Sequence, residues 1–226
     1  MRKLPPIIAF EGIDGSGKSV QFKALKARLT EEGFRVGTLD FPQYESFFGK
    51  EIGKMLSCEE GVSAAEVDVK SMSLWYAMDR EQAFRNFSAA EYDVVLLNRS
   101  TMANAAYQGT RCRGDINDFT KWIFNLEFNV LKIPQPELFF IFDIPVATSR
   151  RNVALKGHRD YVGDDADVYE RDLAFLESVR RGYIACSEIF PGACLLECAE
   201  ADGTMKPIDE ISEIVYSKVI SVIKGA

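Results

Sequence analysis

The sequence predicts an α/β fold in which a mainly parallel, five-stranded sheet is flanked by helices. Short aliphatic and β-branched runs alternate with longer segments whose apolar residues recur at helical spacing. Some of the short runs are apolar almost throughout, which is typical of strands buried on both faces of a parallel sheet. The expected strands are residues 6–10, 34–41, 93–98, 137–143 and 193–198.

The segments between these runs are predicted to be helical. In the first segment Phe22, Leu25 and Leu29 share one face, and Gly33 ends the helix. A longer helix is expected from Ser63 to Phe87, with a bend near 71–73. The other expected helices are a short one within 43–57 and those at 101–108, 117–131, 145–156, 168–190 and from 208 onward.

Composition narrows the class of protein. With 226 residues, 47% hydrophobic and 27% charged, the chain is expected to form a single globular domain over 1–226. A net charge of −7 offers no attraction to nucleic acid or to an anionic membrane, so neither is an expected partner. The longest late apolar run, 138–142, is too short to span a bilayer. The five cysteines lack metal-ligand spacing, so we expect reduced thiols and a cytoplasmic location.

One glycine-rich stretch directly follows the first strand. Residues 12–19 read G-x-x-x-x-G-K-S, the pattern of a loop whose backbone N–H groups cradle phosphates. Lys18 would hold the β- and γ-phosphates, and Ser19 would offer its hydroxyl to Mg²⁺. The alternative is a glycine-rich turn with a surface lysine. The predicted cofactors are ATP and Mg²⁺, bound by Gly12, Ile13, Asp14, Gly15, Ser16, Gly17, Lys18 and Ser19.

The carboxyl ends of the other expected strands carry polar residues. In open α/β sheets, ligands bind beyond these ends. Phe41-Pro42, Asn98-Arg99 and Asp143 would therefore face the same crevice as the glycine-rich loop. We expect a phosphate donor at that loop and an acceptor opposite it.

Several stretches, in their order and spacing, resemble the thymidylate kinase family over nearly the whole chain. They are Phe10–Ser19, Phe41-Pro-Gln-Tyr44 with Gly49 and Ile52, Asp79-Arg80, Asn98-Arg99, Ala105-Ala-Tyr-Gln-Gly109 and Tyr169-Glu-Arg-Asp172. The resemblance implies a P-loop NTPase fold with a lid, a homodimer, and transfer of the γ-phosphoryl group of ATP to dTMP.

The resemblance also implies roles for individual residues. Arg99 would hold the acceptor phosphate and serve catalysis with Lys18. The predicted substrate-binding residues are Asp14 (3′-hydroxyl), Tyr107 (against a 2′-hydroxyl), Tyr76 (stacking on thymine), Arg80 (a thymine carbonyl), Asn104 (the polar edge of the base), Phe41 (the pocket wall) and Arg99. Asp79 is expected to orient Arg80 or to cap a helix.

The lid, at about 156–167, is expected to supply a catalytic arginine. Gly15 follows Asp14 in the glycine-rich loop where some members carry arginine, so Arg159 is the first candidate and Arg150 or Arg151 the next. Phosphoryl transfer needs positive charge on the transferring oxygens. The alternative is a set of solvated loop charges.

The chain departs from the family pattern at Asn98-Arg99-Ser100, where the family usually has aspartate, arginine and an aromatic residue. Asparagine lacks the charge that would assist Mg²⁺, for which Asp14, Asp143 or Glu11 could substitute. Two other functions therefore stay open. One is a kinase for another (deoxy)nucleoside monophosphate or a deoxynucleoside, and the other is a nucleotide-binding protein with weak or lost transfer.

Overall fold

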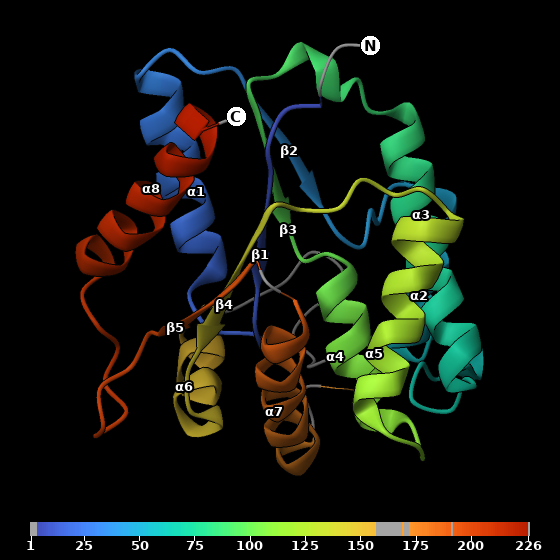
Figure 1. The fold of residues 1–226 in the computed structure, drawn as a ribbon. Coiled ribbons are helices and arrows are strands. Elements are labelled where there is room, and N and C mark those ends of the chain that lie inside the picture. Colours follow the sequence, from blue (N-terminus) through green and yellow to red (C-terminus); the bar gives the residue numbers. More distant parts are fainter. Residues whose placement is uncertain (1–3, 157–168, 170–171, 191, 226) are drawn as a thin grey trace.

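A single sheet of five parallel strands forms the centre of the computed structural model, which describes residues 4–156, 169, 172–190 and 192–225 (Figure 1). The strands are β1 (Ile7–Glu11), β2 (Val36–Asp40), β3 (Val94–Asn98), β4 (Leu138–Asp143) and β5 (Ala193–Glu197), in the order β2-β3-β1-β4-β5. The predicted α/β fold is confirmed. Because all neighbouring pairs are parallel, every carboxyl end lies at the same edge.

The middle strands are the most deeply buried. All of β1 and most of β3 and β4 are shielded from solvent, as their continuous apolar runs predict. The Phe10 ring stacks on Phe142 and contacts Phe140 of the adjacent strand. This packing places the end of β1, from which the glycine-rich loop emerges, at the centre of the sheet.

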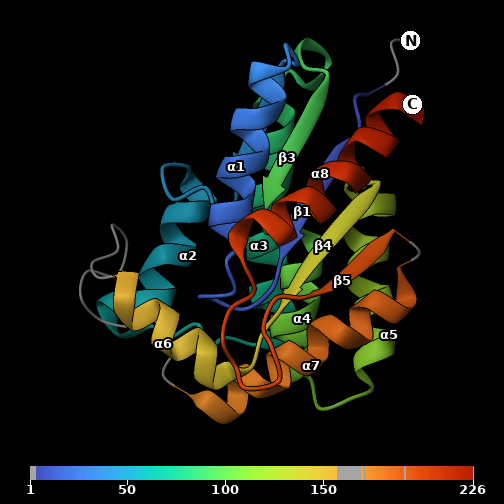
Figure 2. The ribbon, with the colours of Figure 1, turned by 90° about the vertical axis from the view of Figure 1, so that its left-hand side faces the viewer.

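Helices cover both faces of the sheet. Helices α1 (Lys18–Glu31) and α8 (Ile208–Gly225) pack together on one face, in front of the strands in Figure 2. On the other side α4 (Thr101–Arg111) packs against α3, α5 and α7. The remaining elements are α2 (Phe47–Ser57), α3 (Val69–Asn86), α5 (Ile116–Phe124), α6 (Val146–Lys156), α7 (Leu173–Ile189), the short 3₁₀ helices η1 (Glu59–Gly61) and η2 (Ala89–Glu91), and the π-helix η3 (Asn125–Val130).

Three helix predictions were wrong in detail. Helix α3 begins at Val69 rather than near Ser63, because the Asp68 carboxylate accepts the Ser71 N–H as an N-cap, and the helix runs without a break through 71–73. The helix expected over 117–131 is present, but its second half, η3, is a π-helix that continues α5. Helix α7 begins at Leu173, where Asp172 accepts two backbone N–H groups. No helix in the described part of the chain is long and apolar enough to cross a membrane.

Candidate active site

The glycine-rich loop is wedged between β4 and α6. Gly12, Gly15 and Gly17 all have positive φ, and a Cβ on Gly12 or Gly15 would lie 2.6 Å from the Phe142 carbonyl oxygen or 2.5 Å from that of Ser149. Ser149 Oγ and Asn152 Nδ2 donate to the carbonyl oxygens of Asp14 and Gly15 at 2.6 and 2.8 Å. Only glycine fits these contacts and dihedrals, so the loop geometry depends on the sequence motif.

Lys18 and Ser19 open α1 directly after this loop. Lys18 is buried; its Nζ donates to the Ile13 carbonyl oxygen at 2.8 Å and lies 3.9 Å from Asp14 Oδ1. The ammonium group therefore lies against the loop, close to the N-terminus of α1, where the helix dipole is positive. A helix N-terminus with a buried lysine is an anion-binding arrangement.

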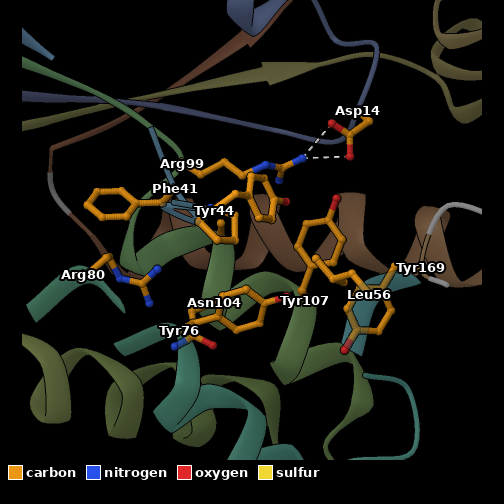
Figure 3. Close-up of a pocket in the computed structure, with 12 residues that line it drawn as sticks. Asp14, Phe41, Tyr44, Leu56, Tyr76, Arg80, Arg99, Asn104, Tyr107 and Tyr169 are labelled. Atoms are coloured by element: carbon orange, nitrogen blue, oxygen red, sulfur yellow. Dashed lines mark hydrogen bonds and ion pairs between the residues drawn. The ribbon is translucent and has the colours of Figure 1, made fainter. Parts of the chain in front are cut away.

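A cavity opens beside the loop (Figure 3). Every residue predicted to hold the acceptor lines it, although these residues come from the glycine-rich loop, the end of β2, α3, the end of β3 and α4. The lining comprises Asp14, Phe41, Pro42, Tyr44, Leu56, Tyr76, Arg80, Arg99, Ala103, Asn104, Tyr107 and Tyr169. The roles of Tyr44 and Leu56 were missed, since an aromatic residue in a loop and an apolar residue on a helix carry no specific signal.

Arg99 joins the cavity to the glycine-rich loop. Its Nη2 lies 2.7 and 2.8 Å from the two carboxylate oxygens of Asp14, as Figure 3 shows. The Arg99 guanidinium also lies 5.4 Å from the centre of the Tyr107 ring. Arg99 itself has a φ of 62°, an uncommon conformation for a residue with a side chain. This turn aims the side chain back across the cavity mouth.

Ser100 fixes that turn, which accounts for one departure from the family pattern. Its Oγ donates to Glu11 Oε1 at 2.6 Å, and its side chain caps the start of α4. Tyr183 Oη donates to the other Glu11 oxygen at 3.3 Å. Burial raises the pKa of Glu11, against the lowering effects of the Ser100 hydrogen bond and of the Arg99 and Lys18 charges. Glu11 is thus committed to internal hydrogen bonds.

The carboxylate of Asp40 lies beside Asn98, the position at which the family usually has an aspartate. Asp40 ends the neighbouring strand in register with Asn98, and Asn98 Nδ2 donates to Asp40 Oδ1 at 2.8 Å. Asn98 Oδ1 is buried and has no hydrogen-bond partner among the described residues. Surrounding protein raises the pKa of Asp40, although its side chain reaches solvent, while the Asn98 hydrogen bond and the Arg99 and Lys18 charges oppose this rise. Asp143, in contrast, pairs with Arg180 at 2.6 and 2.8 Å.

Arg80 has a partner that the sequence reading missed. Its Nε and Nη2 donate to the two oxygens of Glu127, at 2.6 and 2.5 Å. Glu127 lies in η3 and also accepts from Thr101 and Asn104. A glutamate within an apolar, helical stretch was the available signal, because a charged residue there must be paired if it is buried.

We expected Asp79 to orient Arg80 or to cap a helix, but Asp79 forms no ion pair with Arg80 in the structure. Its carboxylate accepts from the backbone N–H of Gln43 and from Ser46 Oγ, both at 3.0 Å. Burial raises the pKa of Asp79, and these two hydrogen bonds oppose the rise. Asp79 therefore anchors the segment after β2, which carries Phe41, Pro42 and Tyr44 into the cavity wall.

A second hollow lies on the other side of the glycine-rich loop. It is bounded by Gly15, Ser16 and Gly17 and by mainly apolar side chains from α1, α6 and α8. Its lining also includes Val20, Gln21, Phe142, Asn152, Leu155, Met205, Lys206, Ile208 and Ile211. The loop thus separates a polar aromatic cavity from an apolar hollow, an arrangement suited to two ligands that meet at the loop.

Comparison with known proteins agrees with this geometry. The family model described as thymidylate kinase matches residues 10–203. The chain belongs to the thymidylate kinase family. It is 31% identical over 170 residues to the thymidylate kinase of Mycobacterium tuberculosis, covering 74% of this chain and 78% of the relative. It is 25% identical over 222 residues to a probable thymidylate kinase of Pyrococcus horikoshii, covering 96% and 95% of the two chains.

The catalytic arginine predicted from the resemblance to thymidylate kinases, Arg159, lies outside the described residues, as does most of the lid. Of the two alternatives, Arg151 donates through Nη2 to the Gly203 carbonyl oxygen at 2.8 Å and to Thr148 Oγ1 at 3.1 Å. Arg150 is exposed on α6. Arg151 is thus occupied in tying α6 to the segment before α8, whereas Arg150 stays an alternative to Arg159.

Proposed function

We propose that this protein transfers the γ-phosphoryl group of ATP to dTMP, giving dTDP and ADP. The observation that carries the proposal is the cavity itself, because every acceptor-binding residue predicted from the family resemblance lines it, directly beside a phosphate-binding loop. Several relatives bear the name thymidylate kinase, including one from Geotalea daltonii that is 28% identical over 96% of this chain and 98% of its own.

The acceptor would lie with its phosphate at Arg99 and its base deeper in the cavity. Tyr76 and Phe41 offer ring surfaces to thymine, while Arg80 and Asn104 offer a donor and an acceptor to its polar edge. Asp14 would meet the 3′-hydroxyl, and Tyr107 would crowd a 2′-hydroxyl. Since the acceptor phosphate is already anionic, the reaction needs charge stabilisation and alignment rather than a general base.

The donor would bind at Gly12–Ser19, with its phosphates on the loop and α1 N-terminus and its base in the apolar hollow. Bound Mg²⁺ would neutralise charge on the phosphate oxygens. The residues fit such an ion: Ser19 offers a hydroxyl, Asn98 Oδ1, which has no partner in the described part of the chain, can accept from a metal-bound water, and Asp40 supplies negative charge beside Asn98. No group of three or more acidic, histidine or cysteine side chains among the described residues forms a metal site alone.

Three further expectations belong to the same proposal. Residues 1–226 act as one kinase domain, with a lid at about 156–167 that supplies Arg159. The family resemblance supports a homodimer. A cytoplasmic location is consistent with the cysteines, since Cys58, Cys112, Cys186, Cys194 and Cys198 are all free thiols.

The departure at Asn98 favours one rival function, nucleotide binding with weak or lost transfer. A kinase for a different monophosphate or for a deoxynucleoside is the other rival. An ADP-release assay with thymidine and a panel of nucleoside monophosphates separates the three. We expect the highest kcat/KM with dTMP; tight ATP binding without turnover on any acceptor would contradict transfer, and a higher kcat/KM for another acceptor would reassign the substrate.

A further inference from the structure

We propose that Glu127 sets the hydrogen-bonding polarity of the base pocket, so that the pocket accepts a pyrimidine with a ring N–H at position 3 and discriminates against cytosine. The inference rests on the proposed function, because it concerns how that function's acceptor is chosen. Glu127 is a positioning residue in this account: it acts through Arg80 and Asn104 and is absent from the cavity wall.

The position of Glu127 follows from the π-helix. Residues 125–130 continue α5 with a wider turn, and Glu127 there is 0% exposed. Its Oε2 accepts from Arg80 Nε and Thr101 Oγ1, both at 2.6 Å. Its Oε1 accepts from Arg80 Nη2 at 2.5 Å and Asn104 Nδ2 at 2.9 Å. Because each oxygen accepts from two donors, the site suits an ionised carboxylate, which only accepts.

The consequence for Asn104 is a fixed amide orientation. Its Nδ2 donates to Glu127 Oε1 and, at 3.0 Å, to the Ser73 carbonyl oxygen, so both amide hydrogens are used. Its Oδ1 is buried and has no partner among the described residues. Rotating the amide by 180° would place Oδ1 against the Ser73 carbonyl oxygen and Glu127 Oε1, which are both acceptors. Asn104 can therefore present only an acceptor to a ligand, and that acceptor requires an N–H from the base.

Glu127 keeps Arg80 as a hydrogen-bond donor to the ligand, whereas it keeps Asn104 as an acceptor. Burial alone would lower the pKa of Arg80, but the charge and hydrogen bonds of Glu127 raise it above its ordinary value. The guanidinium remains charged, lies 5.9 Å from the centre of the Phe41 ring, and has N–H groups on its far side beyond those used by Glu127. Thymine and uracil carry a carbonyl next to a ring N–H, which matches a donor beside an acceptor. Cytosine carries an amino group next to a bare ring nitrogen and mismatches both.

The test is the ratio of dissociation constants for dCMP and dTMP, measured by calorimetry on the full chain without turnover. In the wild type we expect dTMP to bind about 100-fold more tightly than dCMP, with dUMP nearer to dTMP. Glu127→Gln replaces one acceptor oxygen by a donor that can face the amide oxygen of a turned Asn104. We expect this variant to reduce the ratio by about tenfold or more.

Matched variants separate this role from general damage to the fold. Glu81→Gln breaks another arginine–glutamate pair of α3, in which Arg85 is 70% and Glu81 18% exposed, and should leave the ratio unchanged. Should Glu127→Gln fail to fold, Thr101→Val removes one hydrogen bond to Glu127 and should lower the ratio severalfold. A folded Glu127→Gln or Thr101→Val protein with the wild-type ratio would overturn the inference while leaving the proposed function intact. A wild type that binds no pyrimidine monophosphate would overturn both.

Discussion

At the scale of single residues, Asp40 and Asn98 form a mixed carboxylate–amide pair where the family usually has an aspartate at position 98. Their hydrogen bond of 2.8 Å keeps one negative charge at the end of two adjacent strands, close enough for Arg99 and Lys18 to act on it. Asp40 thus supplies a negative charge next to the amide of Asn98. This charge is the reason to expect transfer activity despite Asn98.

Exchanging the two side chains tests that account. Asn98→Asp alone places a second carboxyl group where Nδ2 now donates, so the pair must share a proton and its pKa rises. Such a group favours the folded state only while protonated, so the loss of stability should be absent below about pH 4 and reach about 1–3 kcal/mol at pH 7. Asp40→Asn combined with Asn98→Asp again pairs one carboxylate with one amide, so it should restore stability and show the wild-type Mg²⁺ dependence of nucleotide binding, measured by thermal unfolding and calorimetry. A double variant that behaves like Asn98→Asp would contradict that account.

Glu11 gives a second pH-dependent prediction. Burial raises the pKa of this carboxyl above its ordinary value of 4.5, so stability is fully present below that value and is lost as pH rises through the raised pKa. Glu11→Gln removes this dependence. We expect the melting temperature of the variant, relative to that of the wild type at the same pH, to rise by about 3 °C between pH 4 and pH 8. The exposed strand-end variant Glu197→Gln is the control, and parallel curves for Glu11→Gln and wild type would contradict the expectation.

At the scale of elements, the cavity depends on segments held in place by buried polar side chains. Asp79 of α3 holds the segment between β2 and α2, and Glu127 of η3 holds Arg80 and α4 together. In each case a carboxylate with several donors adds to the apolar contacts that hold these helices. Substitution there should alter binding as well as stability.

Asp79→Ala tests the anchored segment. It leaves the Gln43 N–H without its acceptor and releases the part of the chain that carries Phe41 and Tyr44. We expect the KM for dTMP to rise about tenfold, with the KM for ATP unchanged, in steady-state assays. Asp68→Ala is the matched control, because it removes the N-cap of the same helix at a cost of about 1 kcal/mol and should leave both KM values alone. Equal changes in the two KM values would argue against a local anchor.

Both the lid expected at about 156–167 and its catalytic arginine stay predictions. Arg159→Ala should reduce kcat by about a thousandfold or more, with little change in nucleotide affinity, because the arginine would act on charge that develops during transfer. Rapid-quench turnover and calorimetry measure the two effects, with exposed Arg113→Ala as control. A comparable loss of kcat in Arg150→Ala or Arg151→Ala, with Arg159→Ala normal, would assign the role to α6 instead.

At the scale of the whole molecule, an apolar patch lies on α2 and α3. Phe47 is 62% and Leu74 43% exposed, and the rings of Phe47 and Phe48 contact Trp75. Exposed apolar groups gathered in one place are typical of interfaces. This patch is where we expect the homodimer to form.

Sedimentation equilibrium should give twice the 25.4 kDa mass of one chain. Phe47→Asp should shift the protein to monomer, since a buried, unpaired charge at an interface is strongly unfavourable. Val130→Asp is the matched control, because Val130 is also 62% exposed but lies on η3 rather than on α2 or α3. A wild-type monomer, or a dimer that survives Phe47→Asp, would contradict the proposed interface.

The sequence by itself determined the five strands, the glycine-rich loop and, through the family resemblance, the acceptor-binding residues that line the cavity, but not Tyr44 and Leu56. These features depend on local patterns: apolar runs, positive φ at glycine, and short motifs. Only the tertiary structure decided that Glu127 fixes Arg80 and Asn104, that Asp79 anchors a loop, and that Asp40 stands beside Asn98. Each of these pairs is distant along the chain, and the side chains meet only because helix packing and strand register bring them together.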